Sequence, residues 1–148
     1  VRFKFPGINR DENLVTGFVD RSLKDVHAGH LCYATLSQTD LTLSDRKTGS
    51  MNLAVKKKHA DDAAAKRKPD PAFEAMLKKK SQVTPLKADQ EWHVYTLVTE
   101  GDEMRFSLDG KLIASHRSEG YAHDMKRWFS FLANSTVWID DVKIYKVR

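Results

Sequence analysis

Hydrophobic and polar residues alternate in short runs over the first third of the chain. Alternation with a period of two, in runs rich in Val, Thr, Leu, Tyr and Phe, is typical of half-buried β-strands. Turn-forming residues separate these runs in PGINRDEN, HAG, SQTD and DRKTG. The pattern therefore predicts five strands, over residues 2–5, 14–19, 30–37, 40–44 and 49–55.

The alternation stops between residues 56 and 81, where ADDAAAKRK and PDPAFEAMLKKK are rich in helix-forming residues and lack β-branched ones. Asp70 and Pro71 suit the N-cap and the first turn of a helix, and apolar residues follow at helical spacing. The lysines that come next suit the negative end of the helix dipole. We expect a basic, partly helical insertion over residues 56–81, with one short helix at about 70–80.

Strand patterns return after Glu91 and are clearest in WHVYTLVTEG and EMRFSLDGKLIASHR. Asp109 and Gly110 are a typical residue pair for a type I′ hairpin turn between two alternating runs. WFSFLA and TVWIDDVKIYKV supply two further strand patterns. Strands at short spacing, with a helix only as an insertion, predict an all-β sandwich of two antiparallel sheets. Residues 1–148 are few enough to form a single domain.

Asp140 and Asp141 lie inside the last of these patterns. The hydrophobic residues before the pair occupy one phase of the alternation, and those after it occupy the other. A β-bulge at the pair would account for the shift, and a strand buried on both faces is the alternative.

The distribution of charge adds to this picture. Between residues 54 and 80 there are nine basic and four acidic residues, and the rest of the chain is neutral. The insertion is therefore either a solvated helix that covers a sheet edge or an electrostatic contact made by Lys78, Lys79 and Lys80. Such a contact would suit an acidic protein partner, an anionic polysaccharide or a membrane surface. Nucleic acid is not expected, because Phe73 is the only aromatic residue interleaved among the lysines.

Hydrophobic residues make up 41% of the 148 residues, and no run approaches the roughly 18 apolar residues of a membrane-spanning helix. We therefore expect no transmembrane segment. The single cysteine, Cys32, has no partner for an internal disulfide. It lies in the strand pattern HLCYATL, where a small buried side chain is its expected role.

Several short motifs in the second half occur in this order: Trp92-His93, Gly101–Met104, Leu108–Lys111, Ser118–His123 with Lys126, and Ile139–Tyr145. The series resembles the C-terminal half of the concanavalin A-like, or laminin G-like, jelly-roll domains of exported bacterial proteins, especially of planctomycetes. Such domains are related to the 3-keto-disaccharide hydrolase domain and are labelled glycoside hydrolase family 16-like. The resemblance extends to AGHLCYATLSQTDLTLSDRKTG and to the Lys-rich insertion, so it covers most of the chain.

This resemblance implies a jelly-roll fold and a periplasmic, cell-surface or secreted location. It also implies that VRFKF is not the natural beginning of the domain and that its first one or two strands are missing. Some laminin G-like domains bind calcium, so Asp140 and Asp141 are candidate ligands for Ca²⁺. No other cofactor is expected.

A family 16 glycosidase needs carboxylates in a spacing such as E-x-D-x-x-E, so that two of them face one sugar across about 5.5 Å. The chain has no such triplet, and its acid clusters are adjacent pairs, which point to opposite faces of a regular strand. It has neither H-E-x-x-H nor G-x-S-x-G. The sequence favours a non-catalytic domain and leaves open a glycoside hydrolase whose mechanism these motifs do not cover.

Saccharide binding needs aromatic platforms beside polar side chains. The candidates are Trp128, Trp138, Tyr33, Tyr121, Asn134 and His30. The aromatic residues have an alternative role in the core or at a sheet edge, and His30 has one in a turn. We predict a carbohydrate-binding or protein-interaction module of an exported protein. A glycoside hydrolase and a structural subunit of a larger assembly are the alternatives.

Overall fold

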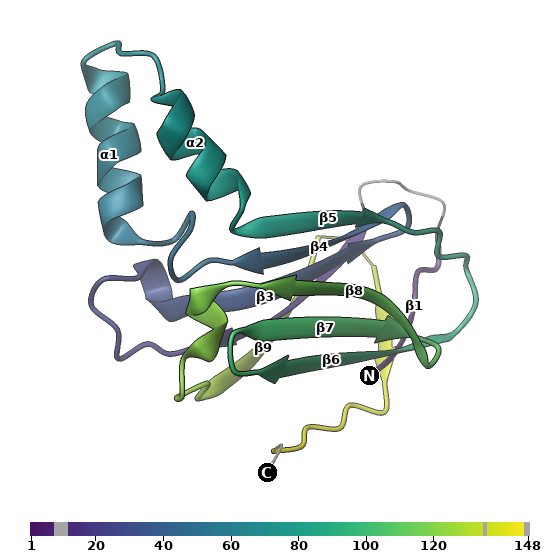
Figure 1. Ribbon diagram of the computed structural model, residues 1–148. Coiled ribbons are helices and arrows are strands. Elements are labelled where there is room, and N and C mark those ends of the chain that lie inside the picture. The colour runs from purple at the N-terminus through teal and green to yellow at the C-terminus, as the bar shows by residue number, and fades with distance from the viewer. Residues whose placement is uncertain (8–11, 135, 147–148) are drawn as a thin grey trace.

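The computed structural model describes residues 1–7, 12–134 and 136–146. Within these ranges the chain forms two five-stranded sheets, in which all neighbouring strands are antiparallel. The sheets pack face to face, and a pair of helices projects from one end of the sandwich (Figure 1). The expected antiparallel β-sandwich is thus confirmed.

The first sheet, which we call the β6 sheet, has the strand order β10-β1-β6-β7-β8. Its strands are β1 (Arg2–Lys4), β6 (His93–Glu100), β7 (Glu103–Leu108), β8 (Lys111–Arg117) and β10 (Trp138–Asp140). The second, the β3 sheet, has the order β5-β4-β3-β2-β9. Its strands are β2 (Asn13–Val19), β3 (His30–Ser37), β4 (Asp40–Asp45), β5 (Ser81–Pro85) and β9 (Trp128–Ala133). Two short 3-10 helices, η1 (His27–Gly29) and η2 (Glu119–Ala122), lie in the loops before β3 and β9.

Alternate residues of the two sheets face each other and form the core. Phe3 and Phe106 are among its fully buried side chains. The Tyr95 ring stacks on Phe106 with ring centroids 5.2 Å apart, and its hydroxyl shares a 2.6 Å hydrogen bond with Thr16. That bond satisfies the polar end of a side chain otherwise surrounded by hydrocarbon. Cys32 belongs to the same core, as the sequence predicts, and burial raises the pKa of its thiol to about 12.

The insertion contains two helices, α1 (Leu53–Ala64) and α2 (Pro71–Lys78), which together we call the helical hairpin. The predicted strand over 49–55 is wrong. The side chain of Asn52 accepts hydrogen bonds from two backbone amides that follow it, so it caps a helix at this point. The single helix predicted for the insertion corresponds to α2, which Asp70 caps as expected.

α1 has no strong apolar stripe, which is why the sequence pattern does not reveal it. None of its residues is buried. Ion pairs one turn apart take the place of apolar contacts: Lys57 Nζ lies 2.5 Å from Asp61, and Lys58 Nζ lies 2.6 Å from Asp62. The sequence also gives no signal for β5, because this edge strand is short and half exposed. Among the described residues, no helix is long and apolar enough to cross a bilayer.

Two turns use left-handed backbone conformations. Asp109 and Gly110 both have positive φ angles, 49° and 79°, as the predicted type I′ turn between β7 and β8 requires. Asp141 also has a positive φ of 49°, and β10 ends one residue earlier, at Asp140. The final strand is therefore shorter than expected: it ends at Asp140 instead of continuing through a bulge, and residues 141–146 form no strand.

Candidate functional site

The outer face of the β3 sheet carries hydroxyl side chains around one aromatic ring. Along β3, alternate residues belong to the core, which leaves Tyr33 and Thr35 on the outside. β4 places Ser44 opposite Tyr33 and Thr42 opposite Thr35. On the other side of β3, β2 places Gly17 opposite Tyr33. Three hydroxyls and a tyrosine thus lie side by side on two strands.

Tyr33 is held in place by three neighbours. A Cβ atom at Gly17 would lie 2.3 Å from a ring carbon of Tyr33, so only glycine leaves room for the ring. The Arg46 guanidinium lies over the ring, 4.5 Å from its centroid. His30 Nδ1 shares a short hydrogen bond with the Tyr33 hydroxyl. Because these groups cover it, Tyr33 is only 1% exposed although it lies on the outer face.

Burial sets the protonation of this cluster. It lowers the pKa of His30, and the positive charge of Arg46 lowers that pKa further, so the imidazole is neutral at pH 7. Burial raises the pKa of Tyr33, whose hydroxyl stays protonated. Burial also lowers the pKa of the Arg46 guanidinium, against the opposing effect of Tyr33. Since an arginine starts from so high a pKa, Arg46 remains a cation.

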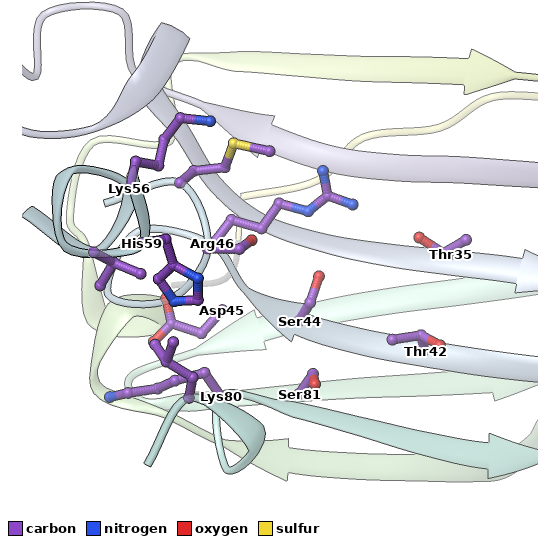
Figure 2. A pocket seen from close by; sticks show the side chains of 13 residues that line it. Thr35, Thr42, Ser44, Asp45, Arg46, Lys56, His59, Lys80 and Ser81 are labelled. Carbon is purple, nitrogen blue, oxygen red and sulfur yellow. The ribbon is translucent and has the colours of Figure 1, made fainter. Parts of the chain in front are cut away.

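A hollow of about 650 Å³ lies between the helical hairpin and strands β3, β4 and β5. We call it the helical hollow. Figure 2 shows its hydroxyl side chains spread along the strands, Lys56, His59 and Lys80 at the helical end, and Arg46 extending from that end toward the strands. The lining consists of Thr35, Thr42, Ser44, Asp45, Arg46, Ser50, Met51, Val55, Lys56, His59, Leu77, Lys80 and Ser81.

Asp45 is the only carboxylate in this lining, and it is committed to the fold. The residue is 2% exposed, and its carboxylate accepts four hydrogen bonds. Two come from the amide and hydroxyl of Thr48, at 3.0 and 2.5 Å. The others come from the Ser118 hydroxyl at 2.5 Å and the Gly120 amide at 3.0 Å. Asp45 therefore joins the end of β4 to the η2 loop, and three of the four hydrogen bonds fall on its Oδ2.

A second hollow, of about 490 Å³, lies on the same face beside β2 and β9. We call it the β9 hollow, and it is lined by Val19, Arg21, Leu23, Val26, Ala28, Gly29, His30, Tyr33, Ser130 and Leu132. Trp128 stands next to it, because it pairs with Val19 across the two strands and shares a face with Ser130. The Trp128 residue is 60% exposed.

The structure brings three of the six predicted saccharide ligands to this face: His30, Tyr33 and Trp128. It places the other three elsewhere. Tyr121 is fully buried, and its hydroxyl bonds His116 Nδ1 at 2.7 Å, so it fills the core, which was its alternative role. Trp138 lies on β10 of the other sheet, with its ring 6.2 Å from that of Trp92. Asn134 is exposed just after β9.

The three lysines predicted to bind a partner are not equivalent. Lys78 and Lys79 are exposed at the end of α2. Lys80 Nζ lies 2.7 Å from Glu119, and the Lys80 side chain is only 17% exposed, so it ties the helical hairpin to the η2 loop. The role of these lysines in partner binding stays a prediction.

Asp140 and Asp141 are both exposed at the end of β10. Asp140 lies 3.5 Å from Arg2, and Asp141 lies 3.0 Å from Lys143. In the part of the chain that the structure describes, no three His, Cys, Asp or Glu residues gather to hold a metal ion, and calcium binding by this pair stays a prediction. Both carboxylates thus form ion pairs with basic side chains on the surface.

Sequence reasoning missed the basic residues of the helical hollow, namely Arg46, Lys56 and His59. Arg46 lies in the turn signal DRKTG, and nothing local marks it as a ring-stacking residue. The outward hydroxyls could have been predicted from the sequence, because Thr42 and Ser44 alternate with leucines in DLTLSD.

Comparisons of the chain with known protein families, with curated proteins and with solved structures find no match.

Proposed function

We propose that this chain is a non-catalytic carbohydrate-binding domain whose binding surface is the outer face of the β3 sheet. The observation that carries the proposal is the pair of hollows on that one face, which meet at the stacked side chains of Tyr33 and Arg46. Their volumes, about 650 and 490 Å³, are of the size that small-molecule sites have, roughly 300–1,000 Å³. A short oligosaccharide lying across the strands would contact both.

The side chains around the hollows are suited to sugars. Sugar hydroxyls pair well with groups that both donate and accept hydrogen bonds, and Thr35, Thr42 and Ser44 are such groups. The apolar face of a sugar ring stacks on an aromatic ring. Trp128 offers an exposed ring beside the β9 hollow, while Tyr33 is covered by Arg46.

The placement of the carboxylates supports binding without hydrolysis. A glycosidase of the usual kind needs two carboxyl groups facing one glycosidic bond. The described residues that line the two hollows include one carboxylate, Asp45, and four hydrogen bonds hold it in the fold. The hydrolase alternative therefore gains no support from the geometry of this face.

We infer further that the sandwich is a concanavalin A-like jelly roll of an exported bacterial protein. Two antiparallel five-stranded sheets are compatible with this fold. The motif order from Trp92-His93 to Ile139–Tyr145 supports the family and, through it, the exported location.

Two exposed tryptophans on opposite sheets allow a matched test. Trp128 is 60% exposed on the β3 sheet, and Trp138 is 52% exposed on the β6 sheet. We expect titration calorimetry with a panel of oligosaccharides to find a saturable ligand. Trp128→Ala should weaken its binding about tenfold, the usual scale for one lost aromatic contact of about 1.5 kcal/mol. Trp138→Ala should leave the affinity unchanged. Equal effects of the two substitutions, or no saturable ligand in the panel, would contradict the proposal.

A further inference from the structure

Arg46 is a half-buried cation without an anionic partner among the described residues. Its backbone amide donates to the Leu31 carbonyl at 2.8 Å, which fixes the residue at the end of β4. Its guanidinium is held on the Tyr33 ring, and within the described part of the chain none of its side-chain N–H groups donates to a protein acceptor. The residue is only half-buried, and its nitrogens are not among the described buried atoms that lack a hydrogen-bond partner. Its unused donors are therefore accessible from the hollow and available to an acceptor that comes from outside the chain.

Lys56 adds a second unpaired charge to the helical hollow. It lines the hollow from α1, its side chain is exposed, and no described carboxylate lies within ion-pair distance of it. The two other basic residues of the lining are already paired. His59 Nε2 lies 3.4 Å from Glu74, and Lys80 Nζ lies 2.7 Å from Glu119. The hollow thus has a surplus of positive charge, carried by Arg46 and Lys56.

The single acid in the lining does not cancel this surplus for a ligand. Asp45 accepts four hydrogen bonds from Thr48, Ser118 and Gly120 and forms no ion pair with Arg46 or Lys56 among the described residues. Beyond the basic end, the hollow floor is made of strand hydroxyls (Figure 2). A bare inorganic anion would use the cations and leave these hydroxyls unused. A ligand that carries both an anionic group and several hydroxyls would use all of them.

We propose that the helical hollow binds a hexuronate unit of an acidic polysaccharide. Arg46 is the direct ligand of its carboxylate, Lys56 adds attraction at the mouth of the hollow, and the strand hydroxyls bond the sugar hydroxyls. A guanidinium is suited to this role because its planar fork matches a carboxylate with two parallel hydrogen bonds. The inference rests on the proposed carbohydrate-binding function and specifies its ligand class.

The test compares four ligands by titration calorimetry: a hexuronate oligomer, the neutral hexose oligomer of the same linkage, a sulfated hexose oligomer and sodium acetate alone. We expect the hexuronate oligomer to bind at least about tenfold more tightly than the neutral oligomer, with the difference shrinking as salt is added. Arg46→Gln should lower the hexuronate affinity about tenfold or more, and Arg46→Lys should recover only part of that loss.

Lys56 and Lys68 supply a matched pair, since both side chains are exposed in the helical insertion, neither forms an ion pair among the described residues, and only Lys56 lines the hollow. Lys56→Gln should weaken hexuronate binding about threefold, and Lys68→Gln should not change it. This pair decides the question even if Arg46→Gln fails to fold.

The outcomes separate this inference from the proposed function. Equal binding of the neutral and hexuronate oligomers, or equal effects of the two lysine substitutions, overturns the hexuronate site but leaves carbohydrate binding standing. Preference for the sulfated oligomer, or acetate binding as tight as that of the hexuronate oligomer, also overturns it. If no oligosaccharide binds at all, the proposed function fails together with it.

Discussion

At the scale of single residues, Asp45 and Arg46 are sequence neighbours with opposite roles. Asp45 turns inward and joins the end of β4 to Thr48, Ser118 and Gly120. The approach is so close that a Cβ atom on Gly120 would lie 2.0 Å from the Asp45 carboxylate. Arg46 turns outward onto the Tyr33 ring, and among the described residues its side chain donates to no protein acceptor. Asp45 thus stabilises the end of the sandwich, and the side chain of Arg46 lies on its outer face.

Replacing Asp45 should therefore destabilise the fold strongly. Asp45→Ala leaves buried donors of Ser118 and Gly120 without an acceptor, and we expect the free energy of unfolding to fall by about 3 kcal/mol. Asp40 is the control, because it lies on the same strand, is half exposed and, among the described residues, accepts a side-chain hydrogen bond only from Thr39. Asp40→Ala should cost less than about 1 kcal/mol. Urea denaturation measures both, and similar losses would contradict the assigned role of Asp45.

The sequence identified some of these residues and missed others for a physical reason. Tyr33 and His30 were candidates because aromatic and imidazole groups are typical of saccharide sites, and the structure joins them through a hydrogen bond. Arg46 was not a candidate, because its contact with Tyr33 depends on how β4 lies beside β3. Tyr121 was a candidate by residue type alone, and it is fully buried, so its ring cannot contact a saccharide on the surface. Residue type predicts chemistry, but exposure is set by tertiary packing.

At the scale of elements, the helical hairpin differs from the strands in how it is stabilised. Neither helix contains a buried residue. Its two helices meet through partly exposed groups, such as His59 and Phe73, with ring centroids 5.7 Å apart. The N-caps Asn52 and Asp70 and the ion pairs of α1 add to these contacts. Such contacts are individually weak.

We therefore expect the hairpin to open locally while the sandwich stays folded. In native-state hydrogen exchange, amides in the middle of α1 and α2 should exchange about 100-fold faster than those of β3 and β4, which corresponds to an opening free energy about 3 kcal/mol lower. Two-dimensional NMR of the exchanging protein measures this directly. Equal protection of α1 and β3 would show that the hairpin belongs to the cooperative core.

The success of the sequence pattern also varied by element. Period-two alternation located β2, β3, β4, β7 and β9 closely. Burial itself alternates most clearly along β4 and β7, whereas β3 is buried on both faces over most of its length. The sequence pattern failed for α1, whose helix depends on a cap and ion pairs, and for β5, a short edge strand. It extended the last strand too far, because Asp141 takes a left-handed conformation that no hydrophobic pattern reveals.

At the scale of the whole molecule, the sandwich decides which candidates can act together. Trp128 and Trp138 are alike in the sequence, but they lie on different sheets. Only Trp128 shares a face with Tyr33 and the two hollows. The fold class could be predicted from alternation and turn residues. The proposed binding face could not, because it is formed by strands from both ends of the chain and by a helical insertion that the alternation does not describe.

The central claim is that the outer face of the β3 sheet binds saccharides. The most direct test is to follow backbone amide chemical shifts by NMR while an oligosaccharide from the panel is titrated into the ¹⁵N-labelled protein. We predict saturable shift changes centred on Tyr33, Ser44 and Arg46, with the amides of β6 and β7 unaffected. Saturable changes centred on Trp138 and the β6 sheet, or no saturable change with any oligosaccharide of the panel, would contradict the claim.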